Sequence, residues 1–124
     1  MKFKDDDIKN EFEGAPLLLQ IMANDFDSYS RAYFQKEPVL TRVLEAIPGD
    51  SSVHEDYRAV DIRQEHEGAL FYTPDEEKEL LNYINKKYYR NDDKPSIICH
   101  SFNGSPYHFH LQIAVFTKVY MVKP

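Results

Sequence analysis

Apolar residues in the first third of the chain recur at the spacing of one helix face. Proline just before this run suits a first helical turn, because its missing N–H lies where no intrahelical partner exists. The pattern predicts a helix over 15–34, which begins beside Pro16 and has an apolar stripe. The residues that form this stripe are Leu18, Ile21, Met22, Tyr29 and Tyr33.

Later segments follow strand patterns, either rich in β-branched residues or alternating between polar and apolar positions. Between Arg58 and Arg63, for example, Asp61 shares a face with Arg63 while Val60 faces the other way. Loop residues at 103–106 indicate that the last two of these segments form a hairpin. The predicted strands are 39–44, 58–63, 96–101 and 107–115, and 116–122 is expected to add an edge strand or a C-terminal strap.

A second helix is predicted over 74–89. Thr73 and Glu76 have the spacing of a capping box, and Pro74 occupies the first helical position between them. An apolar stripe follows at helical spacing. It consists of Leu80, Leu81, Ile84 and Tyr88. The segment 65–71 before this helix is expected to be a plain connection.

These elements predict an α+β fold, with a small antiparallel sheet of four or five strands and flanking helices. The 124 residues fit one domain, and a chain of this size can bury a substantial core. The charged segment 1–14 ends in Gly14 and is interpreted as a loosely held N-terminal arm. The domain itself is expected to cover 15–124.

The net charge of −6, without any basic block, argues against nucleic acid as a partner, because phosphate binding needs clustered lysine and arginine. No stretch is long and apolar enough for a membrane span, and the charged N-terminus does not resemble a signal peptide. A single cysteine, Cys99, fits a reducing compartment. We therefore expect a monomer that is cytoplasmic as synthesised and reaches any target outside the membrane through another factor.

Histidine and aspartate residues form the most informative polar pattern. His54 and Asp61 lie seven residues apart across a predicted turn, and His108 and His110 alternate on a predicted strand. Two imidazoles and one carboxylate are a ligand set for a catalytic zinc ion that keeps one open position. From the residues alone, either both strand histidines bind the ion, or one binds it and the other acts as an acid–base residue.

At these residues the chain resembles the D-alanyl-D-alanine carboxypeptidase family of zinc metallopeptidases. That family shares a superfamily with lysostaphin-type peptidases and the Hedgehog signalling domain. Ser52, His54, Ala59 and Asp61 match its first zinc motif in order and spacing, and the run 108–112 matches its second. The similarity covers about 39–113, and in this range the chain is similar to small phage and prophage members of the group.

The resemblance implies a zinc ion in a groove on the open sheet face, with His54, Asp61 and His110 as ligands. It assigns His108 to catalysis and Arg42 to substrate or oxyanion support. Ser52 would hydrogen-bond the ligand loop. The implied activity is hydrolysis of a peptide bond in peptidoglycan stem peptides, as a D,D-carboxypeptidase or an L,D-endopeptidase.

Two departures from the family pattern favour an alternative function. Tyr57 stands where the motif has glycine, and the position three residues before His110 is Tyr107 rather than an acidic residue. The alternative is a catalytically inactive metal-binding protein that acts as a binding or structural module, for example in a phage particle. Of the remaining candidates, His100 is interpreted as a structural or surface histidine and Cys99 as a small buried residue.

Overall fold

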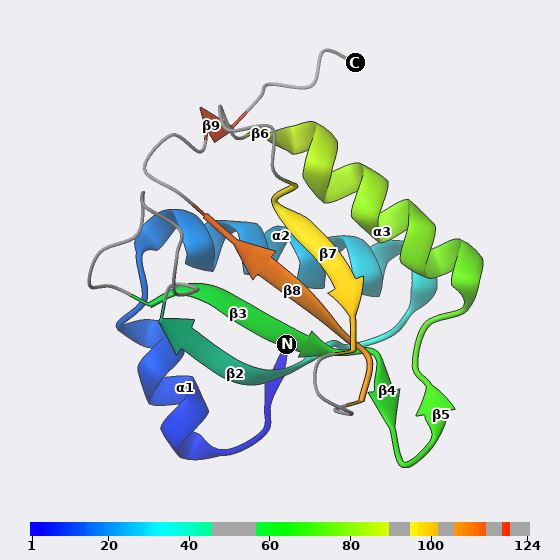
Figure 1. Ribbon diagram of the computed structural model, residues 1–124, viewed down its shortest axis with the longest axis horizontal. Coiled ribbons are helices and arrows are strands. Elements are labelled where there is room, and N and C mark those ends of the chain that lie inside the picture. Colours follow the sequence, from blue (N-terminus) through cyan, green and yellow to red (C-terminus); the bar gives the residue numbers. More distant parts are fainter. Residues whose placement is uncertain (46–56, 90–94, 102–105, 114–117, 120–124) are drawn as a thin grey trace.

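A computed structural model describes residues 1–45, 57–89, 95–101, 106–113 and 118–119, and shows three helices around a mixed set of strands (Figure 1). The helices are α1 (Asp6–Glu13), α2 (Leu17–Phe34) and α3 (Pro74–Lys87). The longer strands are β2 (Val39–Glu45), β3 (Tyr57–Arg63), β7 (Ile97–His100) and β8 (His108–Gln112). Two-residue strands are β1 (Lys2–Phe3), β4 (Glu65–His66), β5 (Ala69–Leu70), β6 (Tyr88–Tyr89) and β9 (Lys118–Val119).

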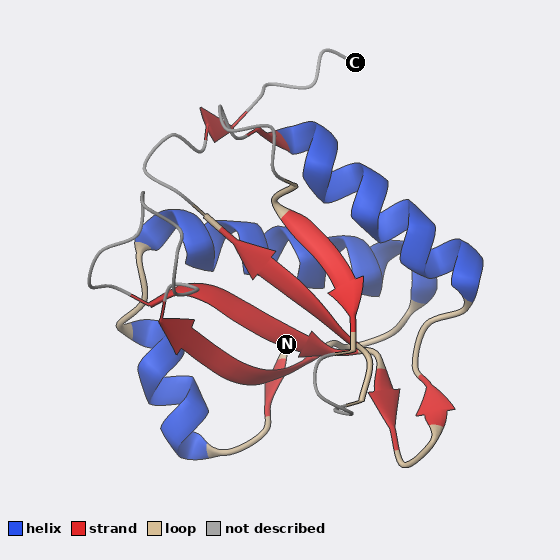
Figure 2. Ribbon diagram, viewed as in Figure 1, coloured by secondary structure: helices blue, strands red, loops and turns tan. Residues whose placement is uncertain are grey.

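The main sheet has five strands in the order β1-β2-β3-β8-β7. Its neighbours are antiparallel except for β1 and β2, which run parallel. Helices α2 and α3 pack against one face of this sheet, which is seen from its other face in Figure 2. The predicted α+β class with flanking helices is confirmed, and the sheet is mostly antiparallel, as expected. The pairing of the last two long strands is confirmed as well.

The core lies between α2, α3 and the sheet because the alternating strands send their apolar residues to that side. Phe109 of β8 packs edge-on against Phe26 of α2 at a ring-centroid distance of 5.0 Å and against Tyr72 at 5.5 Å. Leu111, two residues further along β8, is also fully buried. Burial of each such side chain contributes about 1.5–3 kcal/mol. His108 and His110, which alternate with them, must therefore face the opposite side of the sheet.

The capping box of α3 forms as the sequence predicts. The backbone N–H of Glu76 donates to Thr73 Oγ1 at 3.2 Å, and the backbone N–H of Thr73 donates to Glu76 Oε1 at 2.9 Å. The helix ends at Lys87, two residues earlier than expected, because Tyr88–Tyr89 pair with Lys118–Val119. Part of the predicted C-terminal strap is thus strand β9.

The expectation of a loosely held arm over 1–14 is wrong. This segment forms β1 and α1, and Asp5 caps the helix by accepting a hydrogen bond from the N–H of Ile8 at 2.8 Å. Phe12 is only 5% exposed, and its ring lies 5.5 Å from that of Phe3. The high charge of the segment concealed an apolar face formed by Phe3, Ile8 and Phe12.

The segment 65–71, predicted as a plain connection, contains the β4–β5 hairpin. Glu67 and Gly68 both have positive φ, at 53° and 81°, which matches the twist needed for a tight two-residue turn. The hairpin projects beyond the end of β3 (Figure 1). It places His66 beside the sheet face that carries the histidines.

Candidate functional site

The strand register aligns residues of the second sheet face, the face opposite α2 and α3, in two neighbouring rows that are mostly polar. The first row crosses β2, β3, β8 and β7 through Arg42, Asp61, His110 and Ile98. The second row crosses β3, β8 and β7 through Arg63, His108 and His100. We call Asp61, His100, His108 and His110 the histidine cluster.

Asp61 lies at the centre of the histidine cluster. Its Oδ1 is 2.9 Å from Nδ1 of His110, and its Oδ2 is 3.6 Å from Nε2 of His108. Asp61 and His110 are only 2% and 4% exposed. A buried carboxylate is stable only when paired, so this contact fixes the orientation of both side chains. The structure thus brings together three of the residues that the sequence selected.

His108 lies nearer the surface than His110, with 16% of its side chain exposed. Its Nδ1 is 3.0 Å from the carbonyl oxygen of Pro106. Because a carbonyl can only accept, this contact places a proton on Nδ1 and leaves Nε2 of the neutral ring as a proton acceptor. The acceptor nitrogen faces the carboxylate of Asp61.

His100 belongs to the cluster, although the sequence interpretation treated it as a structural or surface histidine. Its ring centroid is 4.7 Å from that of His108 and 5.5 Å from that of His110. Burial, together with the neighbouring charges of His108 and His110, lowers the pKa of His100. Its pairing with His108 depends on the hairpin register, which the loop residues at 103–106 alone did not specify.

Two ring nitrogens of the cluster are buried without a hydrogen-bond partner in the described part of the chain, Nε2 of His100 and Nε2 of His110. A buried polar atom that lacks a partner costs about 1–3 kcal/mol. Such atoms are rare in folded proteins and call for an explanation, of which an ion or ligand is one. The histidine cluster therefore has the character of a binding site.

A pocket of about 220 Å³ opens beside Asp61 and His108. Its cationic side chains are Lys4, Arg42 and Arg63, of which only Arg42 was selected from the sequence. Lys4 was missed because it belongs to the segment taken for a loose arm. The backbone N–H of Lys4 donates to the carbonyl of Leu40 at 2.9 Å, which fixes this residue beside β2. The other lining residues are Thr41, Asp61, Glu65, His66, Pro106, Tyr107 and His108.

Two predicted site residues, His54 and Ser52, lie outside the described residues, and only the backbone of Tyr57 is described. Within the described residues, no group of three or more histidine, cysteine, aspartate or glutamate side chains is arranged to hold a metal ion. Asp61 Oδ1 accepts from Nδ1 of His110, so Nε2 is the nitrogen of His110 that keeps its lone pair. Nε2 is also the buried atom without a partner in the described structure, so it is the atom of His110 that fits a metal ion.

No known protein family, curated protein or solved structure matches this chain. The likeness to zinc metallopeptidases remains a prediction that rests on the residues quoted for it. No helix among the described residues is both long and apolar enough to cross a membrane.

Proposed function

We propose that this protein is a zinc-dependent peptidase that hydrolyses a peptide bond in peptidoglycan stem peptides. The observation that carries the proposal is the buried Asp61–His110 pair, in which one imidazole nitrogen contacts the carboxylate and the other has no partner in the described structure. A histidine that binds zinc typically has its other ring nitrogen hydrogen-bonded to a carboxylate or a carbonyl, as Nδ1 of His110 is here. The match of these same residues to two motifs of the peptidase family supports the assignment.

Asp61 and His110 would hold the ion, and His54, which lies outside the described residues, would complete the set. Zinc in such a site supplies a Lewis acid that activates water and polarises the carbonyl under attack. The main strands hold Asp61 and His110 at paired positions of β3 and β8, so their relative placement does not depend on a loop. Rigid placement of this kind is what a catalytic site requires.

His108 is suited to be the acid–base residue of the reaction. The Pro106 carbonyl accepts from Nδ1, so Nε2 is the atom that takes a proton from water and returns it to the leaving amine. Arg42 lies opposite Asp61 on β2 and lines the same pocket as His108. A guanidinium at this position would stabilise negative charge on the substrate or on the developing oxyanion.

The test is a digest of purified muropeptides by the protein loaded with one equivalent of zinc, followed by mass spectrometry. Cleavage of a single type of peptide bond, lost on chelation and restored by zinc, is the expected result. A protein that binds zinc at full occupancy and leaves every muropeptide intact would overturn the assignment as a peptidase. The masses of the products also identify the bond that is cut.

The alternative, an inactive metal-binding module, has one specific observation in its favour. The residue three positions before His110 is Tyr107, whose side chain is 49% exposed and carries no carboxylate. Under the alternative, zinc would bind with the same residues and the digest would show no product. The same experiment therefore distinguishes the two functions.

A further inference from the structure

We infer that the pocket beside the histidine cluster binds a carboxylate group of a peptide, held by Lys4 and Arg63 together with Arg42. The inference deepens the proposed function, on which the identity of the peptide as a substrate rests. It names the chemistry that the ligand must present next to the bond that is cut.

The first support is that three cationic side chains from separate parts of the chain line one small pocket. Lys4 follows β1, Arg42 belongs to β2, and Arg63 ends β3. Among the described residues, none of these three side chains forms an ion pair or hydrogen bond. Like charges that are gathered without a partner repel one another, so an anion in the pocket would relieve a cost that the fold otherwise bears.

Two carboxylates, Asp61 and Glu65, also line the pocket, and among the described residues neither forms an ion pair with Lys4, Arg42 or Arg63. Asp61 contacts His110 and His108, as described above. Glu65 accepts a hydrogen bond from the backbone N–H of Tyr107 at 3.0 Å through its Oε1. The chain as a whole has a net charge of −6, so a pocket lined by three cationic and two anionic side chains is more basic than the composition would give.

Arginine points to a carboxylate in particular. Its guanidinium offers two parallel N–H groups that match the two oxygens of a carboxylate, and such charge-assisted pairs are about twice as strong as neutral hydrogen bonds. The pocket volume of about 220 Å³ is below the roughly 300–1,000 Å³ typical of drug-sized ligands. It therefore suits a carboxylate with a short piece of peptide rather than a long chain.

The position of the pocket determines how far this carboxylate lies from the peptide bond that is cut. Asp61 and His108 line the pocket themselves, so the anion lies within one or two residues of the scissile bond. In a stem peptide two groups meet this condition, the C-terminal carboxylate and the free α-carboxylate of the γ-linked glutamate. The chemistry is shared, and the two sources are separated by experiment.

The experiment compares three synthetic stem pentapeptides, L-Ala-γ-D-Glu-L-Lys-D-Ala-D-Ala with all carboxylates free, with the C-terminus amidated, and with the glutamate α-carboxylate amidated. We expect one of the two amides to lower kcat/KM of the zinc-loaded protein by at least about tenfold. Arg63→Gln should lower kcat/KM for the free acid by a similar factor and leave that amide almost unchanged. Lys4→Gln, at an exposed residue, should give the same pattern more weakly.

Lys78→Gln is the matched control, because it removes one positive charge from an exposed position of α3, away from the pocket. Cleavage of all three peptides at equal rates would overturn the inference. So would an Arg63→Gln or Lys4→Gln variant that slows every peptide by the same factor. If Lys78→Gln has an effect as large as that of Lys4→Gln, the effect comes from the net charge of the protein and not from the pocket. That result would also overturn the inference.

Binding separates a failure of this inference from a failure of the proposed function. Calorimetric titration of the metal-free protein with the same peptides needs no turnover. If the free acid binds at least about tenfold more tightly than one amide, and Arg63→Gln removes the difference, the carboxylate site stands even where zinc-loaded protein cleaves nothing. Equal affinity for all three peptides, or no binding, would overturn the inference whatever the digest shows.

Discussion

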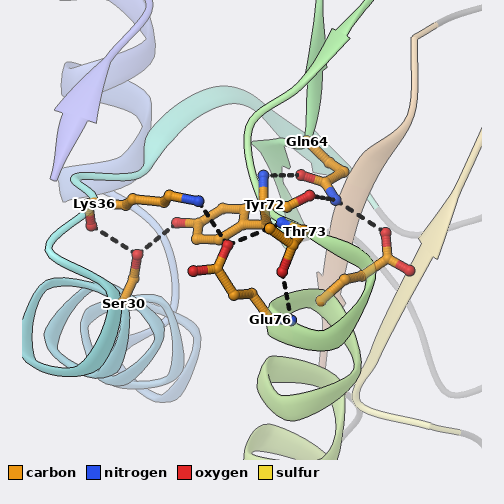
Figure 3. A network of polar contacts seen from close by, with 7 residues as sticks. Ser30, Lys36, Gln64, Tyr72, Thr73 and Glu76 are labelled. Atoms are coloured by element: carbon orange, nitrogen blue, oxygen red, sulfur yellow. Dashed lines mark hydrogen bonds and ion pairs between the residues drawn. The ribbon is translucent and has the colours of Figure 1, made fainter.

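Two polar clusters lie close together in this protein, one on each side of the end of β3, and they differ in how their atoms are paired. Gln64 belongs to a network on the helix side that also includes Ser30 and Tyr72 (Figure 3). Its neighbour Arg63 belongs to the second sheet face with the histidine cluster. In the network, the buried side-chain polar atoms have hydrogen-bond partners. The histidine cluster, in contrast, has two buried nitrogens without partners in the described structure.

The polar side-chain atoms of Gln64, Ser30 and Tyr72 all form hydrogen bonds within the network. Gln64 is fully buried, and its Oε1 accepts from the backbone N–H of Tyr72 at 2.8 Å while its Nε2 donates to the carbonyl of Tyr72 at 3.0 Å and to Glu77 Oε1 at 3.1 Å. Ser30 donates its hydroxyl proton to the carbonyl of Lys36 at 2.7 Å, so Tyr72 must be the donor in its 2.6 Å contact with Ser30. Such a network joins α2, β3 and the start of α3 into one rigid unit.

The contrast separates a structural role from a functional one on physical grounds. A buried polar group with all its partners stabilises the fold and needs nothing from outside. A buried group without a partner lowers stability and is retained where another requirement, such as a ligand, accounts for it. The network thus supports the end of β3, and the histidine cluster next to it is the part that calls for a ligand.

The largest expected effect follows from removing the imidazole of His110. His110→Ala should lower zinc affinity by more than the roughly 10–100-fold seen when only an outer partner of a ligand is lost, and hydrolysis should fall to background. Zinc content after dialysis, measured by atomic absorption, and circular dichroism as a check of the fold give the result. His66→Ala, at an exposed histidine, is the control for zinc content, and zinc retained by His110→Ala would contradict the assignment.

His108→Ala should act differently, because its imidazole moves a proton but does not hold the ion. We expect zinc content to stay at that of the wild type while kcat falls by about 10²–10⁴-fold, the usual contribution of an acid–base residue. Loss of metal in both variants, or in neither, would show that the roles of the two strand histidines are assigned wrongly.

A comparable change in the network should affect stability and leave the chemistry in place. Gln64→Leu leaves the N–H and carbonyl of Tyr72 buried without these partners, so the free energy of unfolding should fall by about 3 kcal/mol. The same substitution at Gln112, whose Nε2 makes one exposed hydrogen bond to the carbonyl of Pro95, should cost well under 1 kcal/mol. Urea unfolding measures the free energy of unfolding of both variants. Equal decreases in the two would mean that the network does not stabilise the fold more than an exposed hydrogen bond does.

The sequence was sufficient for features that depend on local patterns and insufficient for those that depend on register. The capping box at Thr73 and the alternation around Asp61 are read within a few residues, and both predicted the structure correctly. The place of Lys4 beside β2 and of His100 beside His108 depends on pairing between segments far apart in the chain. Helix α1 was missed because charged residues surround its two apolar positions, Ile8 and Phe12.

The smallest predicted effect concerns Glu76, which joins the network to the capping box. Burial acts to raise the pKa of Glu76, but hydrogen bonds from Lys36 and from the backbone of Thr73 outweigh it and hold the pKa below its ordinary value of 4.5. A carboxyl whose pKa is lowered by folding stabilises the protein above the unfolded pKa, and this contribution disappears as the pH falls through the folded pKa.

Glu76→Gln keeps a side chain that can complete the capping box but removes the charge facing Lys36 Nζ at 2.5 Å. At pH 7 the wild type should therefore be more stable than the variant by about 0.5–1 kcal/mol. Below pH 4.5 this difference should shrink towards zero, because protonated Glu76 no longer attracts Lys36. Urea unfolding at pH 7, 5 and 3.5 measures the difference, and a constant value across this range would show that the ion pair does not contribute. Because Glu76 belongs to the network and lies outside the histidine cluster, zinc content at pH 7 should be equal in the two proteins.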